Sequence, residues 1–254
     1  MVKTWRVRIP KLTGSETRKA YIYLPTSYEK NPDKRYPVLY MFDGQNVFFD
    51  SEATYGKSWG LKDYLDYTDT ELIVAAVECN SSPDNARLSE YAPYTFIDPE
   101  FGRFEGRGKI YMDWLVRTFK RNIDKNYRTI PDREHTFIAG SSMGGLMSLY
   151  ALMQYNRYFS KAAALSPSLM FNDRQLMALI HRANLDPNTT LYMDFGSQEF
   201  GLEGCTPWIF ENFCNAIMRR EIFITYRIVP GGTHCEASWE KQVSFMINTL
   251  MYNI

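Results

Sequence analysis

The sequence lacks a long hydrophobic run, an excess of charge of either sign and any cysteine pair of the Cys-x-x-Cys type. A membrane-spanning helix needs about 18 or more consecutive apolar residues, and no stretch of this chain approaches that length. The 29 basic and 29 acidic side chains cancel, so broad electrostatic capture of nucleic acid or of an anionic membrane is not indicated. These absences argue against an integral membrane protein and against a nucleic-acid-binding protein.

Three further features bear on the location of the protein, on metal binding and on the state of its thiols: the amino terminus, the histidines and the cysteines. The chain begins MVKTWRVRIP, which has neither an apolar segment of signal-peptide length nor a small-residue cleavage site, so we expect a cytoplasmic location. The three histidines are scattered and show no spacing such as His-Glu-x-x-His, so we expect neither a metal site nor another cofactor. Composition leaves homo-oligomerisation open. Without a secretory signal, the four cysteines are expected to be reduced thiols: Cys79, Cys205, Cys214 and Cys235.

Two kinds of apolar pattern alternate along the chain. Apolar and polar positions alternate over the first 40 residues, which is typical of an antiparallel hairpin or meander with one exposed face. Nearly continuous apolar runs, typical of strands buried on both faces of a parallel sheet, follow at 36–43, 71–78, 135–140, 161–167, 190–196 and 222–230. Helical spacing marks 109–124, 146–155, 174–183, 208–220 and 238–252. We predict one α/β domain over 1–254, with a mostly parallel sheet of about eight strands, an antiparallel amino-terminal edge and helices on both faces.

A serine flanked by glycines stands between a predicted strand and a predicted helix. Residues 140–144, Gly-Ser-Ser-Met-Gly, fit the pattern Gly-x-Ser-x-Gly with Ser142 at its centre. In this context the glycines permit a strained turn that projects the central side chain from the sheet edge, as a nucleophile requires. Glycine–serine turns also cap helices or cradle phosphates, but a phosphate loop would carry a lysine here and none follows.

A serine hydroxyl needs a base, and His234 is the predicted one. It lies in "VPGGTHCEASWE", a glycine-rich loop between the last strand and the last helix, where this architecture brings a base over the sheet end. The alternative for His234 is a turn residue that caps the last helix. His135 begins a strand and His181 lies within a predicted helix, so we expect both to be structural or surface residues.

The histidine in turn needs a carboxylate between Ser142 and His234 in the chain. Glu199 in "DFGSQEF" is favoured, because it follows a buried strand across a glycine that can turn the chain. Asp194, inside that strand, and Asp173, at the start of a helix, remain alternatives.

The developing oxyanion needs hydrogen-bond donors that are already in place. One is predicted to be the backbone N–H of Met143, directly after the nucleophile. The other is expected from "FDGQNVF", after the strand at 36–43, where Gly44 and Gln45 can present backbone N–H groups. Asp43 is expected to brace this loop.

These segments together resemble a known family. "YMFDGQNVF", "YRTIPDREHTFIAGSSMGGLMSLY" and "VPGGTHCEASWE" resemble the putative esterase family of α/β-hydrolases, which includes esterase D, siderophore esterases, feruloyl esterases and mycolyltransferases. The resemblance runs from about residue 20 to the end, with the motifs in the family's order. It implies the α/β-hydrolase fold, with Ser142 as nucleophile and His234 as base. It also implies Glu199 as the acid, in a Gly-x-x-Glu arrangement, and the N–H of Gln45 as the second oxyanion donor.

The predicted function is therefore that of a serine carboxylic ester hydrolase. It would act through an acyl-enzyme on small or medium acyl esters, with a small-molecule ester as its partner. Two alternatives remain: acyl transfer to an alcohol by the same triad, and a hydrolase fold kept as a non-catalytic binding module. The complete triad argues against the binding module.

The substrate pocket is expected to draw on segments 79–107 and 200–210. The first is weakly patterned and too long for an ordinary connection, and such loops usually act as lids or binding loops. Its "ARLSEYAP" resembles a family segment, Arg-x-x-Glu-Tyr-x-Pro, that places Arg87, Glu90 and Tyr91 at the mouth of the site, with a structural ion pair as the alternative. Gly44 and Trp208 complete the candidate substrate-binding residues, and the aromatic ones could instead belong to the core.

Overall fold

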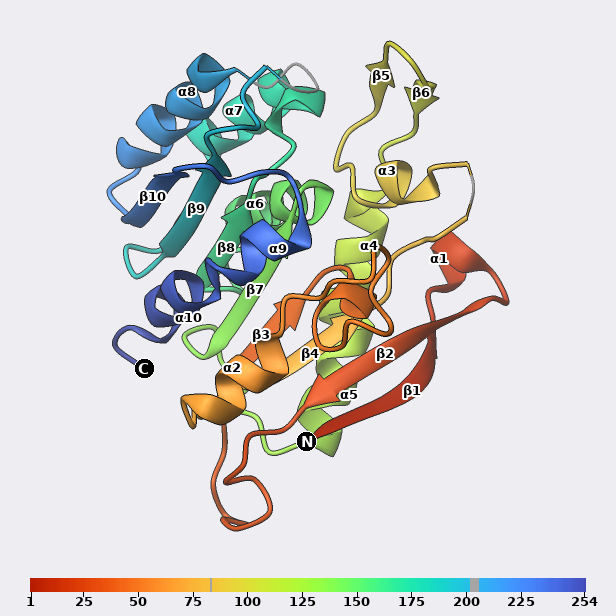
Figure 1. The fold of residues 1–254 in the computed structure, drawn as a ribbon, viewed down its shortest axis with the longest axis vertical. Helices are drawn as coiled ribbons and strands as arrows, with labels where there is room; N and C mark the ends of the chain where they lie inside the picture. Colours follow the sequence, from red (N-terminus) through yellow and green to blue (C-terminus); the bar gives the residue numbers. More distant parts are fainter. Residues whose placement is uncertain (83, 202–205) are drawn as a thin grey trace.

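The computed structural model describes residues 1–82, 84–201 and 206–254, and its centre is an eight-stranded mixed sheet (Figure 1). The strand order is β1-β2-β4-β3-β7-β8-β9-β10. Pairing is antiparallel between β1 and β2 and between β2 and β4, and parallel from β4 to β10. The predicted mostly parallel sheet with an antiparallel amino-terminal edge is thereby confirmed. The strands are β1 (Val2–Arg8), β2 (Thr17–Tyr23), β3 (Val38–Met41), β4 (Ile73–Val77), β7 (Thr136–Ser141), β8 (Lys161–Leu165), β9 (Thr190–Gly196) and β10 (Phe223–Val229).

Helices cover both faces of this sheet, as the sequence predicted. The side chains of α2, α9 and α10 join the apolar core on one face, and those of α4 to α8 join the core on the other. The α-helices are α1 (Pro10–Thr13), α2 (Leu61–Tyr67), α3 (Ala86–Glu90), α4 (Gly108–Trp114), α5 (Lys120–Asn126), α6 (Met143–Gln154), α7 (Asp173–Arg182), α8 (Pro207–Met218), α9 (Glu236–Glu240) and α10 (Val243–Met251). A π-helical turn, Leu115–Phe119, joins α4 to α5, and two 3₁₀ turns are η1 (Gly44–Asn46) and η3 (Leu169–Phe171).

The buried parallel strands show why their sequences are continuously apolar. In β3, Val38 and Tyr40 pack into the core on one face, while Leu39 and Met41 pack into the core on the other. Successive side chains of a strand point to opposite faces, so a strand covered on both sides has no solvent-facing position. Because β3, β7, β8 and β9 pair in parallel, their carboxyl ends meet at one edge of the sheet, which is where the candidate site lies.

Segment 79–107 contains more secondary structure than the expected long loop. It forms α3 and a small antiparallel hairpin of β5 (Phe96–Asp98) and β6 (Gly102–Phe104). Phe96 and Phe104 stack with ring centroids 5.2 Å apart, and both are buried. These elements could not be predicted from the polar sequence, because each is short and is held by tertiary contacts.

Two further expectations bear on the whole chain. Over residues 1–82, 84–201 and 206–254, no helix is both long and apolar enough to cross a bilayer. Cys79, Cys214 and Cys235 are free thiols, and the prediction for Cys205 lies outside the described residues.

Candidate active site

Ser142 stands at a sharp turn between β7 and α6, with backbone angles of φ 57° and ψ −124°. Positive φ is uncommon for a residue with a side chain, so the surrounding structure must hold this conformation. Two backbone hydrogen bonds to neighbouring segments do so: Ser142 N–H donates to Leu165 O over 3.0 Å, and Ser168 N–H donates to Ser142 O over 3.1 Å. The turn leaves the Ser142 side chain half-buried at the sheet edge, whereas Ser141 is buried.

Gly140 explains why this turn needs glycine before the serine. A Cβ atom at Gly140 would lie 2.8 Å from the backbone carbon of Gly144, because the end of β7 and the start of α6 are in direct backbone contact. We expect Gly140→Ala to lower the free energy of unfolding by about 1–3 kcal/mol, measured by urea denaturation, since backbone must move to admit the methyl group. Ser141→Ala is the adjacent control and should cost less. An unchanged urea midpoint for Gly140→Ala would contradict this close approach.

His234 and Glu199 meet directly at the same sheet edge. Glu199 lies just after β9 and is 2% exposed, and its Oε2 is 2.6 Å from Nδ1 of His234, in the loop before α9. The other carboxylate oxygen, Oε1, accepts hydrogen bonds from the backbone N–H of Gly196 (2.9 Å) and from the hydroxyl of Ser166 (2.7 Å). Both oxygens are therefore occupied, and the carboxylate is held in one orientation against the imidazole.

Ser166 and Trp239 support this pair, and no sequence motif marks either residue. Ser166 follows β8 with φ 41°, and its hydroxyl accepts a hydrogen bond from Nε1 of Trp239 over 2.9 Å. The Trp239 ring also lies edge-on to the His234 ring, with centroids 5.1 Å apart. Only the tertiary fold brings residues 166, 199, 234 and 239 together, so spacing along the chain could not reveal the set.

Within the described residues, the Ser142 hydroxyl makes no hydrogen bond to His234. Its Oγ lies instead 3.3 Å from Oγ of Ser168. Catalytic hydrogen bonds are often long or misaligned in unliganded sites and tighten when substrate binds. The structure thus pairs His234 with Glu199 directly and leaves the Ser142 hydroxyl bonded to Ser168.

The turn after β3 lies at the same edge. Asp43 has a left-handed backbone conformation, φ 54°, and η1 follows it directly. In the described part of the chain, neither the Gln45 N–H nor the Met143 N–H has a hydrogen-bond partner. Such unpaired N–H groups are expected in the first turn of a helix, where they are free to bind an anion. The side chain of Gln45 turns back to Cys79, whose N–H it accepts over 3.2 Å.

Arg87 and Tyr91 hold Asp43 from the side of α3. The Arg87 guanidinium donates two hydrogen bonds of 2.7 Å to the Asp43 carboxylate, and the Tyr91 hydroxyl accepts the Asp43 N–H over 3.3 Å. Tyr91 is fully buried, with its ring centroid 5.0 Å from that of Phe42. It therefore supports the turn from within the core. Gly44 is packed equally tightly, because a Cβ there would lie 2.8 Å from the Val77 backbone.

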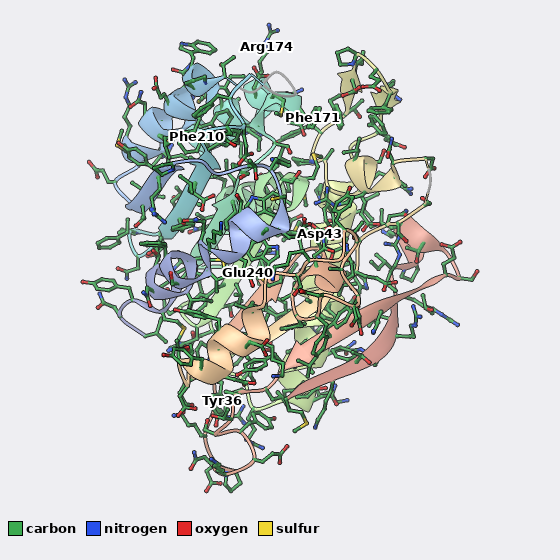
Figure 2. All side chains as sticks on the ribbon, in the orientation of Figure 1. Tyr36, Asp43, Phe171, Arg174, Phe210 and Glu240 are labelled. Atoms are coloured by element: carbon green, nitrogen blue, oxygen red, sulfur yellow. The ribbon has the colours of Figure 1, made fainter. Side chains whose placement is uncertain are left out.

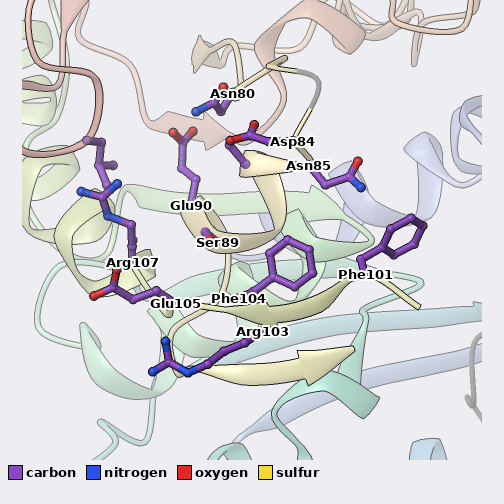
Figure 3. A pocket seen from close by; sticks show the side chains of 12 residues that line it. Asn80, Asp84, Asn85, Ser89, Glu90, Phe101, Arg103, Phe104, Glu105 and Arg107 are labelled. Carbon is purple, nitrogen blue, oxygen red and sulfur yellow. The ribbon is translucent and has the colours of Figure 1, made fainter. Parts of the chain in front are cut away.

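A polar pocket of about 510 Å³ is lined by residues of α3, β6 and the neighbouring loops (Figure 3). Glu90 lines it and pairs with Arg18 over 3.3 Å, with both side chains buried. Burial raises the pKa of Glu90 to about 7. Among the described atoms, Oε1 of Glu90 and Nη1 of Arg18 have no hydrogen-bond partner. The sequence grouped Glu90 with Arg87, but α3 directs the two side chains to different ion pairs.

The remaining candidates lie elsewhere. Trp208, on α8, is 68% exposed and lines a hollow with Asp173 and other residues of α7 that includes neither Ser142 nor His234. Asp194 is buried beneath the site, where its carboxylate accepts hydrogen bonds from the Tyr192 hydroxyl (2.7 Å) and the Ser166 N–H (3.3 Å). Burial raises the pKa of Asp194 to about 7.

Over the described ranges, no group of three or more His, Cys, Asp or Glu side chains could hold a metal ion.

Comparisons with known proteins agree with this architecture. The family model described as "Putative esterase" matches residues 13–249. The uncharacterized protein YbbA of Bacillus subtilis strain 168 is 28% identical over 185 residues, which cover 72% of this chain and 69% of YbbA.

Two solved structures illustrate the likeness in fold. An IroE-like serine hydrolase from Shewanella oneidensis superposes with a TM-score of 0.75 at 19% identity, over 97% of this chain and 79% of that one. A ferulic acid esterase superposes with a TM-score of 0.69 at 21% identity, over 97% of this chain and 95% of that one. The chain therefore belongs to the putative esterase family and has the α/β-hydrolase fold.

Proposed function

We propose that the protein is a serine carboxylic ester hydrolase with a Ser142–His234–Glu199 triad, acting on small or medium acyl esters. The observation that carries the proposal is the buried Glu199 carboxylate 2.6 Å from Nδ1 of His234, at the sheet edge where Ser142 has its strained turn. A carboxylate at Nδ1 keeps the proton on that nitrogen and leaves Nε2 free to act as a base. Family membership and the likeness in fold to a ferulic acid esterase support the same bond type, a carboxylic ester.

The proposed reaction has two steps, acylation of Ser142 and hydrolysis of the acyl-enzyme. Ser142 Oγ attacks the ester carbonyl carbon and forms a new C–O bond while its proton passes to Nε2 of His234. The carbonyl oxygen becomes an oxyanion held by the N–H groups of Met143 and Gln45, and each such donor typically contributes about 3–4 kcal/mol to the transition state. The bond to the alcohol then breaks, His234 protonates the leaving alcohol, and water repeats the sequence on the acyl-enzyme.

The test is to assay the purified protein on nitrophenyl acetate and butyrate before and after treatment with a fluorophosphonate probe. We expect hydrolysis of both esters, its loss on labelling, and a single labelled residue, Ser142, in peptide mass spectrometry. A protein that neither hydrolyses the esters nor reacts with the probe would favour the alternative of a non-catalytic binding module. Product analysis with added alcohols separates hydrolysis from the alternative of acyl transfer, because a transferase converts added alcohol to ester.

A further inference from the structure

Glu236 lies two residues after His234 and reaches across to the turn that contains Gln45. Its Oε1 accepts a hydrogen bond of 3.0 Å from Nδ2 of Asn46, the residue next to Gln45. Both side chains are buried, with 6% and 8% exposed. A buried hydrogen bond to a carboxylate is stronger than an exposed one, so this contact ties the loop carrying the base to the turn carrying the predicted oxyanion donor.

Asn46 is itself fixed by the segment that follows it. Its Oδ1 accepts the backbone N–H of Thr54 over 2.9 Å, and its carbonyl accepts the N–H of Trp59 over 2.8 Å. The side-chain amide therefore has one orientation, with Nδ2 toward Glu236. Movement of Asn46 would carry the Gln45 N–H with it, because the two residues share a peptide bond within η1.

α9 connects Glu236 to the acid–base pair as well. Trp239, on the same helix, donates to Ser166, and Ser166 donates to Glu199. One short helix thus contacts the supports of the predicted general base and of the predicted oxyanion donor. In Figure 2, the labels Asp43 and Glu240 mark the two segments that meet here, the turn after β3 and α9.

We propose that the Asn46–Glu236 hydrogen bond is a positioning contact, which sets the Gln45 N–H at the correct distance from the oxyanion formed on Ser142. The inference rests on the proposed esterase function. Glu236 does not touch the reacting atoms in this account. Its effect is on the transition state, because a donor displaced by about 1 Å can cost about 10²-fold in rate while ground-state binding changes little.

The test exchanges the two groups. In Asn46→Asp, residue 46 keeps an acceptor for Thr54 but faces Glu236 with a second carboxylate, so we expect kcat on nitrophenyl butyrate to fall about 10- to 100-fold at about pH 8, with KM changed less than about 3-fold. In Asn46→Asp with Glu236→Gln, the amide at 236 can donate to the carboxylate at 46, and kcat should recover at least about 10-fold. Glu236→Gln alone keeps an acceptor for Asn46 and should stay within about 3-fold of the unmodified enzyme.

A control and a second readout separate positioning from a general structural role. Glu240→Gln alters an exposed ion pair between α9 and the loop that follows η1, Lys57–Glu240 at 2.8 Å, and should leave kcat unchanged. The inhibition constant of a trifluoromethyl ketone, which mimics the tetrahedral intermediate, should rise in proportion to the loss of kcat/KM across the variants. Thermal midpoints identify any variant that has merely lost its fold.

The outcomes distinguish this inference from the proposed function. Activity that survives Ser142→Ala would overturn the proposed function. Ser142-dependent activity that is unaffected by Asn46→Asp, or that the exchanged pair fails to restore in a folded protein, would overturn the positioning role alone. A loss in Glu236→Gln as large as the loss in Asn46→Asp would also overturn the positioning role. Glu236→Gln keeps the hydrogen bond to Asn46 and removes only the charge of Glu236, so the loss would then come from the charge.

Discussion

Replacing Ser142 by alanine is expected to lower kcat for ester hydrolysis by about 10⁵-fold or more, as measured on nitrophenyl acetate or butyrate. The variant has no atom that can form the acyl-enzyme, so only the oxyanion donors and substrate binding remain. KM should change little because the hydroxyl contributes little to ground-state binding. The fold should persist, since in the part of the chain that the structure describes the Ser142 hydroxyl has one hydrogen-bond partner, Ser168, and the backbone hydrogen bonds of Ser142 do not involve its side chain.

Ser141→Ala is the matched control for this experiment. Ser141 has the same chemistry and the neighbouring position, but it ends β7 and is buried. Its kcat should stay within about 3-fold of the unmodified enzyme, because a hydroxyl outside the reaction contributes nothing specific to the transition state. Retention of more than a few per cent of activity in Ser142→Ala, or equal losses in the two variants, would contradict the nucleophile assignment.

The sheet could be predicted from the sequence because its strands are buried on both faces. Between its flanking glutamates, the run 71–78 has no polar position that would fit a half-exposed strand, and β4 occupies residues 73–77 with every residue buried. The helix at 109–124 was also predicted, but not its π-helical turn at residues 115–119, since apolar spacing alone does not reveal a local change in hydrogen-bond register. The short α3 and the β5–β6 hairpin were missed because neither is long enough to show a period.

The candidate site was predictable where its chemistry depends on local sequence. Gly140 and Gly144 signal the turn at Ser142, because a Cβ at Gly140 would lie 2.8 Å from the Gly144 backbone and one at Gly144 would lie 3.0 Å from Cβ of Phe42. Glu199 and His234 could be proposed because chain order and position after a strand restrict the choice. Their 2.6 Å contact, however, depends on two loops from different strands and could only come from the structure.

The supporting residues could not be predicted, because their roles exist only in three dimensions. Ser166, a serine after a strand, has no sequence feature that marks its positive φ or its two side-chain hydrogen bonds. Glu236 and Asn46 are 190 residues apart in the chain. Arg87 was assigned to the mouth of the site by resemblance, whereas its bidentate pair with Asp43 follows from the packing of α3 against the turn after β3.

Replacing Glu199 by glutamine is expected to lower kcat by about 10³- to 10⁴-fold while preserving the fold. The neighbours of residue 199 determine the orientation of the new amide. The backbone N–H of Gly196 must donate to the position of Oε1, so the amide oxygen occupies that position and its NH₂ group faces Nδ1 of His234. Nδ1 then has to accept, the imidazole proton moves to Nε2, and His234 can no longer take the proton of Ser142.

Two aspartates provide the controls, because each was an alternative for the acid. Asp173→Asn changes an exposed residue at the start of α7 and should leave kcat within about 2-fold of the unmodified enzyme. Asp194→Asn removes a buried carboxylate bonded to Tyr192 and Ser166 but keeps an acceptor for the Ser166 N–H, and we expect a loss below about 10-fold. If Asp194→Asn lost more activity than Glu199→Gln, Glu199 would not be the acid, and its 2.6 Å contact with His234 would be structural.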